Sequence, residues 1–347
     1  LHCRPLAIVF CISMIATYAF GFNMLASYNL QSTFSGFSFY DVKWTPWIIG
    51  GILAVITGWC LLGGGSRIVK VTSTLVPAMG VAYILISVIV MIINRAYLPV
   101  VFSKIISEAF DFKAIFGAFA GSAMMQGIRR GLYSNEAGMG CGAIVSAAAE
   151  CSHPAKQGLI QSFSIYVDTL FIGTATALII LLTGTFDVCD GAGNLLLDQT
   201  GGIEAGIKWT QYALMNTFGT WSGKALAIII VLFVFTSMTG YCYQAESNIR
   251  YLTGNSKKAV AIARAVFLAA SFLGAIVNAD AVWAMGDIGY GLMAWANIIA
   301  IALLAPKAVE ILRDYEKQKK SGKNPVFDPA KFGIKDETGA WNRKKDS

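Results

Sequence analysis

The sequence predicts an all-α integral membrane protein, and two observations support this. Of its 347 residues, 56% are hydrophobic and only 14% are charged, and the mean hydropathy is +0.60. These values are typical of a chain with several membrane spans rather than of a soluble domain. The apolar residues also gather in runs of about 20, the length that an α-helix needs to cross the hydrocarbon core of a bilayer.

We place eight such spans along the chain. They lie near residues 5–30, 46–63, 72–93, 114–150, 157–184, 224–249, 259–278 and 281–305. This predicts a transmembrane domain over 1–305 and a basic C-terminal tail over 306–347. The first span starts within a few residues of Leu1 and is too long for a signal peptide. We therefore expect the chain to be the C-terminal part of a longer protein.

The basic residues predict which way these spans run, because cytoplasmic loops are enriched in Lys and Arg. Basic residues follow the even-numbered spans: Arg67 and Lys70, then Lys156, then Arg250, Lys257 and Lys258, then Lys307 and the tail. The loop at 185–223 carries mainly acidic residues instead. We therefore expect a cytoplasmic tail, and we attribute the net charge of +7 to topology and not to nucleic-acid binding.

Two segments outside the spans also have a helical pattern. Residues 203–218 have apolar residues at helical spacing and predict an amphipathic helix, either over the outer mouth or simply packed on the surface. The tail is helical in pattern over 308–320 and then loses periodicity. We expect the rest of the tail to be solvated, with contact to anionic lipid as the alternative.

Residues 127–142 (GIRRGLYSNEAGMGCG) interrupt the fourth span with two arginines, a carboxylate and five glycines. At membrane depth such residues are tolerated where the backbone faces protein or a cavity. The loop pattern places Lys113 outside the cell and Lys156 in the cytoplasm, so the chain between them crosses the membrane an odd number of times. One crossing with a break is the simplest path. We expect the first half-helix to end near 129–131 and the second to begin near 138–140, with Ser134 or Asn135 as its N-cap.

This interruption is the first candidate site. Free carbonyls at the end of the first half-helix suit a cation or an ammonium group, and free N–H groups at the start of the second suit a carboxylate. Glu136 is the candidate ionisable contact. The alternative is that Glu136 pairs with Arg129 or Arg130 and holds the break closed, and we favour a supporting role for the two arginines.

Polar residues inside three other spans are further candidates. Asp168, next to Thr169, either lines the pathway or anchors the backbone of the broken helix. Thr236 and Ser237 have hydroxyl oxygens of the kind that Na⁺ accepts, although ordinary helix packing is the preferred interpretation on residues alone. Tyr241 lies one turn beyond Ser237. Asp287 needs a partner and serves either a gate or packing.

Enzyme chemistry is not indicated. The histidines are His2 and His153, both flanking spans, and the seven cysteines show no CxxC or Cys/His spacing, so neither a catalytic triad nor a metal site is predicted. There is no Walker loop for a nucleotide. Composition and topology thus support a transporter or channel without an organic cofactor, and they leave the substrate and the oligomeric state open, a monomer included.

The motif series from Arg130 onwards resembles the alanine or glycine:cation symporter family. RGLYSNEAGMG at 130–140 is followed by an alanine run at 147–149, His-Pro at 153–154, Gln-Gly at 157–158 and Asp-Thr at 168–169. The similarity extends over nearly all of 5–305, with Trp283, Asp287 and Asn297 resembling the family's last span.

This resemblance implies Na⁺-driven symport of a small neutral amino acid, by alternating access, across the plasma membrane of a prokaryote. It also implies the LeuT-like inverted-repeat fold of the APC superfamily, with core helices three to ten present and the N-terminal spans absent. The interruption would be the unwound sixth core helix. The alternatives that we carry are a proton-coupled amino acid transporter and a passive channel or structural membrane subunit.

On this mapping the interruption and two other positions contact substrate: Asn135, Glu136, Ala137, Gly138, Gly140, Cys141, Tyr241 and Asn23. Na⁺ would be bound by Thr236 and Ser237, while Arg129, Arg130, Asp168 and Asp287 would support the pathway. Two residues depart from the family pattern: Ala26 stands where a glutamine is usual, and Tyr241 where a tryptophan is common. Both changes would reshape the site, and the first could admit a larger substrate such as glutamine.

Overall fold

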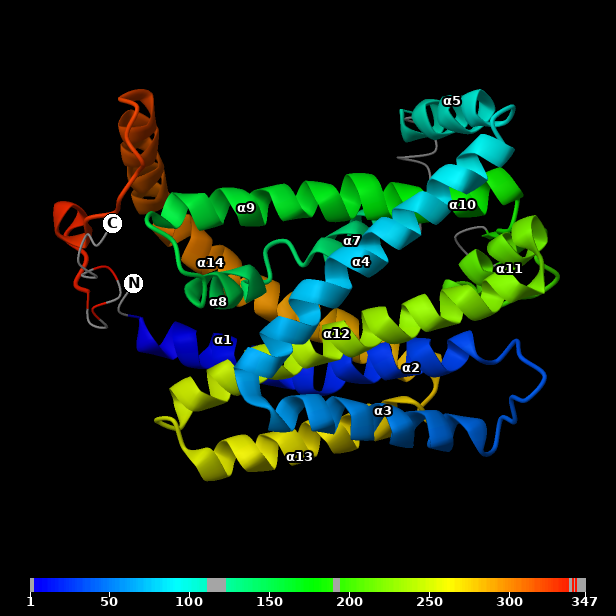
Figure 1. The fold of residues 1–347 in the computed structure, drawn as a ribbon, viewed down its shortest axis with the longest axis horizontal. Helices are drawn as coiled ribbons and strands as arrows, with labels where there is room; N and C mark the ends of the chain where they lie inside the picture. The colour runs from blue at the N-terminus through cyan, green and yellow to red at the C-terminus, as the bar shows by residue number, and fades with distance from the viewer. Residues whose placement is uncertain (1–2, 111–122, 190–193, 337–338, 340, 342–347) are drawn as a thin grey trace.

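The computed structural model describes residues 3–110, 123–189, 194–336, 339 and 341, and these residues are mostly helical (Figure 1). In chain order the helices are α1 (Arg4–Ala16), α2 (Asn23–Thr33), α3 (Thr45–Leu62), α4 (Gly64–Ile93), α5 (Leu98–Ala109), α7 (Ala123–Asn135), α8 (Cys141–Ala147), α9 (Pro154–Tyr166), α10 (Thr174–Thr183), α11 (Ile207–Phe218), α12 (Thr220–Leu252), α13 (Lys257–Gly274) and α14 (Ala279–Lys320). A short hairpin of β1 (Val188–Cys189) and β2 (Leu195–Leu197) precedes α11.

Two of the long helices contain a π-helical turn. The segment η1 (Thr17–Phe22) joins α1 to α2, and η2 (Val167–Gly173) joins α9 to α10, so that residues 4–33 and 154–183 each form one continuous rod. π-Helical turns are rare and occur frequently at functional sites. Nothing in the hydrophobic pattern predicted them.

The structure fits a multi-pass membrane protein. Six of the described helices are long and apolar enough to span a bilayer: 4–33, 45–62, 72–93, 154–183, 220–252 and 279–320. The predicted span at 259–278 corresponds to α13, which is not among the six. The predicted span at 114–150 lies partly outside the described residues, and its described part is split into α7 and α8. Eight crossings therefore remain a prediction.

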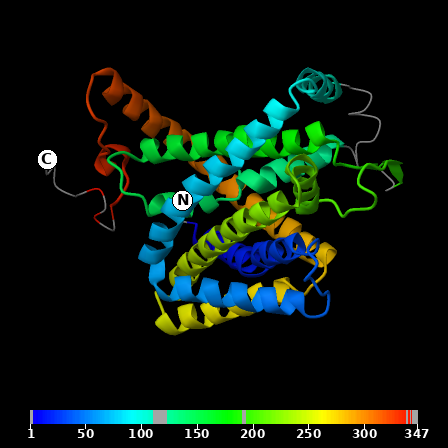
Figure 2. The ribbon, with the colours of Figure 1, turned by 45° about the vertical axis from the view of Figure 1, so that its right-hand side comes forward.

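A tightly packed set of helices forms one side of the molecule, where α3 and α13 lie beside the α1–η1–α2 rod and α12 (Figures 1 and 2). Buried side chains of these helices, such as Leu30, Leu53, Met238 and Phe267, make a common core. Two of these helices approach closely at Gly274, where an added Cβ would lie 2.4 Å from the Cα of Met24.

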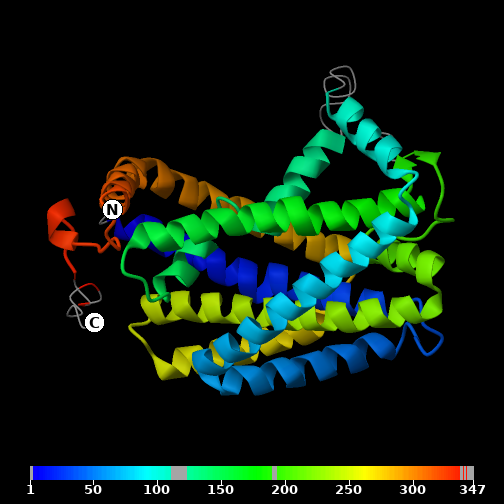
Figure 3. The ribbon, with the colours of Figure 1, turned by 45° about the horizontal axis from the view of Figure 1, so that its top comes forward.

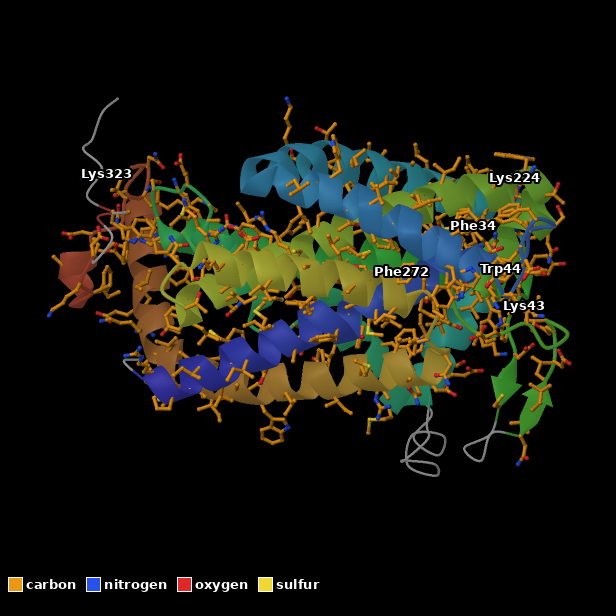
Figure 4. The ribbon with its side chains drawn as sticks, turned by 90° about the horizontal axis from the view of Figure 1, so that it is seen from below. Phe34, Lys43, Trp44, Lys224, Phe272 and Lys323 are labelled. Atoms are coloured by element: carbon orange, nitrogen blue, oxygen red, sulfur yellow. The ribbon has the colours of Figure 1, made fainter. Side chains whose placement is uncertain are left out.

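The two ends of the molecule differ in what they carry. The first described residues and the C-terminal tail lie at the same end (Figure 1), and Lys323 lies far from Lys43 and Lys224 (Figure 4). We call the end that carries the first described residues and the C-terminal tail the tail-bearing end. α8 and the start of α9 also lie there (Figure 1).

Two helices outside the predicted spans need comment. The expected amphipathic helix at 203–218 is confirmed as α11, which begins later, at Ile207, and is packed against α10 and α12. By contrast, α5 (Leu98–Ala109) was not predicted. It has 12 residues, none of them buried, and is too short to be recognised as a membrane span.

The tail differs from the expectation. α14 continues without a break to Lys320, as the pattern over 308–320 predicted. Beyond it, however, the chain returns, and Phe327, Pro329 and Phe332 are buried, the last two in the 3₁₀ turn η3 (Pro329–Phe332). The expectation of a solvated tail is therefore only partly right: most residues of this stretch are exposed, but its buried side chains give it a small apolar core of its own.

Replacing Gly274 by alanine should loosen the packing of α13 on α2. The new methyl group would overlap the backbone of Met24, and overpacking of this kind costs about 1–3 kcal/mol. Thermal unfolding of the purified protein in detergent measures the effect. Gly291→Ala, in α14, is the control, because an added Cβ there meets nothing within 4 Å and should leave the unfolding temperature nearly unchanged. Equal unfolding temperatures for the two variants would refute the close approach.

Candidate functional site

The interruption of the helix lies at residues 136–140, between α7 and α8. Three of these residues have left-handed backbone: Glu136 (φ 53°), Gly138 (φ 82°) and Gly140 (φ 89°). Glycine adopts such angles freely, whereas a glutamate there is uncommon and must be held by its surroundings. The predicted start of the second half-helix is confirmed. The predicted end of the first, near 129–131, is wrong, because α7 tolerates Gly131 and stops only at Asn135.

Side chains from two helices bind the backbone of the interruption. From the end of α7, Asn135 Oδ1 accepts a hydrogen bond from the Ala137 amide (2.9 Å). From α14, Tyr290 donates its hydroxyl to the Ala137 carbonyl (3.2 Å), and Asn297 Nδ2 donates to the Gly138 carbonyl (2.8 Å). The expected N-cap role of Ser134 or Asn135 is therefore wrong, because Gly140 occupies the N-cap of α8.

The carboxylate of Glu136 is bonded by neutral donors. Tyr18, in η1, donates its hydroxyl to Glu136 Oε2 (3.1 Å), and Cys141 Sγ lies 3.0 Å from the same oxygen. Its partners are therefore not the arginines. The alternative in which Glu136 pairs with Arg129 or Arg130 to hold the break closed is wrong.

Arg130 pairs instead with Asp287, which supplies the partner that Asp287 was expected to need. Arg130 NH2 lies 3.0 and 3.2 Å from the two carboxylate oxygens, and the guanidinium lies 4.6 Å from the ring centre of Trp283. Arg129 reaches the same carboxylate only at 3.9 Å and is half exposed. This contact ties α7 to α14, which fits the supporting role expected for Arg130.

The end of α7 is also held by η2. Ser134 donates its hydroxyl to Asp168 Oδ2 (2.8 Å), and Asn135 Nδ2 donates to Thr169 Oγ1 (3.0 Å). Asp168 thus anchors the broken helix through a side chain, which is close to one of the two roles predicted for it. Asp168 also lines the cavity described next, which agrees with the second predicted role, lining the pathway.

A cavity of about 1650 Å³ lies along the interruption. Its walls come mainly from the end of α7, the interruption, α8, the loop after α8, and α9, and a few residues of α12, α14 and the tail complete them. The predicted residues that line it are Asn135, Glu136, Ala137, Gly138, Gly140, Cys141 and Asp168. Amide side chains face the same space, namely Gln157 and Gln161 from α9, Gln244 from α12 and Asn297 from α14. The lining is mostly apolar, and its polar part consists of these amides and of carboxylates that include Glu136 and Asp168. Such a lining suits a small solute that carries both an ammonium and a carboxylate group.

Asn23 lies apart from this cavity. Its side chain is fully buried, with Nδ2 donating to the Phe267 carbonyl (2.8 Å) and Oδ1 accepting from the Ser271 hydroxyl (2.8 Å). It therefore joins α2 to α13. Ala26, on the same helix, packs against the core shared by these helices.

The predicted residues of α12 also lie outside the cavity lining. Thr236 is buried and donates its hydroxyl to the Phe233 carbonyl (3.0 Å), whereas Ser237 is exposed. Tyr241 stacks on Tyr18 with ring centres 5.0 Å apart, so it backs the residue that binds Glu136. Among the described residues, no cluster of His, Cys, Asp or Glu could hold a metal ion.

Two site residues were missed by the sequence analysis, Tyr18 and Tyr290. They lie 118 and 153 positions away from the residues that they bind, and each sits in an ordinary apolar helix pattern. The available signal was weak: a tyrosine inside a span needs a partner for its hydroxyl. Asn297 was noted as part of a family pattern, and its structural role is the bond to Gly138.

Comparison with known proteins identifies the family of this chain. The model of a family described as the sodium:alanine symporter family matches residues 1–329. The putative sodium/proton-dependent alanine carrier protein YrbD of Bacillus subtilis is 43% identical over 293 residues, which cover 84% of this chain and 60% of that protein. This chain therefore spans less than two thirds of the length of that relative.

Two other relatives cover more of the chain. The sodium/proton-dependent alanine carrier protein of Bacillus sp. PS3 is 42% identical over 327 residues, covering 91% of this chain and 74% of the relative. The probable sodium/glutamine symporter GlnT of Bacillus subtilis is 37% identical over 327 residues, covering 94% and 65%. The family resemblance inferred from the motif series is confirmed.

The pairing of Arg130 with Asp287 can be measured as a coupling energy. In a double-mutant cycle with Arg130→Gln and Asp287→Asn, we expect a coupling of about 1 kcal/mol in the free energy of unfolding, since both side chains are partly exposed. The same cycle with Arg129→Gln is the control and should give a coupling near zero, because that guanidinium lies farther away. A larger coupling for Arg129 than for Arg130 would contradict the assignment.

Proposed function

Because this chain belongs to the sodium:alanine symporter family, we propose that it forms the larger part of a carrier that couples the transport of a small neutral amino acid to the Na⁺ gradient. The observation that supports this best is the interrupted helix at 136–140, whose residues line a cavity. Broken helices at membrane depth are a recurrent way for secondary transporters to bind substrate and ion. No other feature of the described residues offers a comparable site.

We propose that the substrate binds against Asn135, Glu136 and the backbone of 137–141. The Glu136 carboxylate is the anionic group of the interruption and suits the substrate's ammonium. Tyr18 and Cys141 would keep that carboxylate oriented, because both bond the same oxygen. The second oxygen of Glu136 is then the natural contact for the substrate.

The coupling ion and the fold are parts of the same proposal. Hydroxyl oxygens of Thr236 and Ser237 are suitable Na⁺ ligands, and two of the relatives carry sodium and proton in their names. A LeuT-like arrangement is supported by the interrupted helix and by its attachment to α14. We place the protein in the plasma membrane. The basic residues of the tail and of the loops on its side support a cytoplasmic tail.

Alanine or glycine is the substrate that we propose, with glutamine as the second candidate. The relative named as a glutamine symporter supports keeping that second candidate. The residue expected to open the site to glutamine, Ala26, packs in the core of α2 and outside the cavity lining. The presence of alanine instead of glutamine at position 26 therefore gives no structural support for glutamine as the substrate.

Transport by the carrier, expressed from its complete reading frame and reconstituted in liposomes, tests the proposal. We expect accumulation of labelled alanine or glycine that requires an inward Na⁺ gradient and saturates. Uptake driven by a proton gradient in the absence of Na⁺ would show that the coupling ion is the proton and not Na⁺. Conductance without saturation or accumulation would favour the passive channel, and no transport at all would favour a structural subunit.

Glu136→Gln should reduce uptake about tenfold or more, because losing one charge-assisted hydrogen bond costs about 1.5–3 kcal/mol. The initial rate of uptake at low substrate concentration is the measurement. Tyr18→Phe is the matched control: it removes one donor to Glu136 and keeps the charge, so a smaller loss is expected. Normal transport by Glu136→Gln would remove this residue from substrate binding.

A further inference from the structure

The chain that follows α14 doubles back along it. We call residues 322–336 the return segment. Gly322 makes the turn with left-handed backbone (φ 75°). The side chain of Gln318 then clamps Val326 on both sides, with Nε2 donating to the Val326 carbonyl (3.0 Å) and Oε1 accepting from its amide (2.9 Å). The start of the return segment is thus fixed to the end of α14.

The return segment is also bonded to the loop between α8 and α9. The Phe327 amide donates to the Ser152 carbonyl (2.8 Å), and the Ser152 hydroxyl donates to the Pro325 carbonyl (2.8 Å). Lys156 Nζ adds a bond to Asn324 Oδ1 (2.6 Å). These bonds run in both directions between the two stretches, so the segment is docked on this loop and not merely close to it.

The buried carboxylate of Asp314, in α14, holds the far end of the segment. His153, fully buried, lies with its Nε2 3.6 Å from Asp314 Oδ2, and Asp314 is ion-paired with Lys331 of the return segment. Burial lowers the pKa of His153, so the imidazole is neutral at neutral pH, and its Nδ1 accepts from the Ala155 amide (3.2 Å). α14, the loop and the return segment therefore meet around one neutral histidine.

Phe327 connects this docking to the candidate site. Its side chain is only 4% exposed, and its ring lies 5.5 Å from His153 and 5.4 Å from Phe332. Together with Val326, it lines the same cavity as Glu136 and Cys141. Both the return segment and α8 lie at the tail-bearing end (Figures 1 and 3). The return segment therefore forms part of the cavity wall at this end.

We propose that the return segment is a gate of the transport pathway and that Phe327 is the residue that closes it at the tail-bearing end. This inference rests on the proposed function for the solute that passes. The loop that binds the segment follows α8 directly, so a movement of the second half of the broken helix would displace Ser152 and release Phe327. Gates that respond in this way are a general property of carriers that expose a site alternately.

The reactivity of Cys141 tests the gate without requiring transport. Cys141 lines the cavity and is buried, so it serves as a reporter once the chain's other cysteines are replaced by serine or alanine. In membranes of known orientation, a membrane-impermeant maleimide is added from the tail-bearing side and the labelling rate is measured. We expect Phe327→Ala, and a chain ending at Ser321, to label about tenfold faster than the parent, which corresponds to about 1.4 kcal/mol.

Two variants serve as controls. Phe327→Leu retains an apolar side chain that fills most of the same space, so its labelling rate should remain near that of the parent. Lys323→Ala changes an exposed residue of the same segment, labelled in Figure 4, and should have no effect. Unfolding temperatures in detergent show whether each variant is folded, and only folded variants are compared.

Several outcomes would overturn the gate. Unchanged labelling in folded Phe327→Ala and in the shortened chain would show that the segment only buttresses α14. Equally faster labelling in Phe327→Leu would show that loss of packing, and not opening, is responsible. Faster labelling from the opposite side would place the opening elsewhere. Labelling does not depend on transport, so a carrier that fails the Na⁺-driven uptake test can still pass this one, and the two proposals fail separately.

Discussion

The described structure depends on one constraint: a backbone that leaves its helix inside a membrane must find hydrogen-bond partners in protein. Residues 136–140 meet this constraint through side chains brought from distant parts of the chain. Tyr290 and Asn297 bind the carbonyls of Ala137 and Gly138, and Tyr18 orients Glu136. Because these partners lie on η1 and α14, the interruption fixes how those elements pack, and they in turn hold the interruption open towards the cavity.

The two π-helical turns belong to the same arrangement. η1 presents Tyr18 to Glu136, and η2 presents Asp168 and Thr169 to the end of α7. An extra residue per turn changes which side chains of a helix face a neighbour, so a π-turn can aim a single polar group at a site while the rest of the rod stays apolar. Both rods keep their membrane-spanning length while they carry these groups.

The sequence predicted most of the fold and part of the site, for identifiable reasons. Apolar runs located the long helices, and glycines with charges located the interruption, because both signals are local. The end of α7 was misplaced because Gly131 suggested a helix end, whereas α7 continues through it to Asn135, where side chains of η2 hold it. The partner of Arg130 was missed because Asp287 lies 157 positions away, whereas Glu136 is near in sequence. Asn23 was assigned to the site by resemblance, yet its amide joins α2 to α13.

The return segment shows how little composition says about a tail. Its lysines suggest a solvated segment, but Lys331 forms an ion pair with Asp314, and Asp314 is buried beside His153. A carboxylate that is taken from water at the end of α14 needs a cation, and the return segment supplies one. That requirement brings Phe332 and Phe327 against the helix, and Phe327 then reaches the cavity wall. A charge pair outside the apolar spans, together with the bonds of Gln318 and Ser152 to the return segment, thus holds an aromatic side chain at the wall of the cavity that contains Glu136.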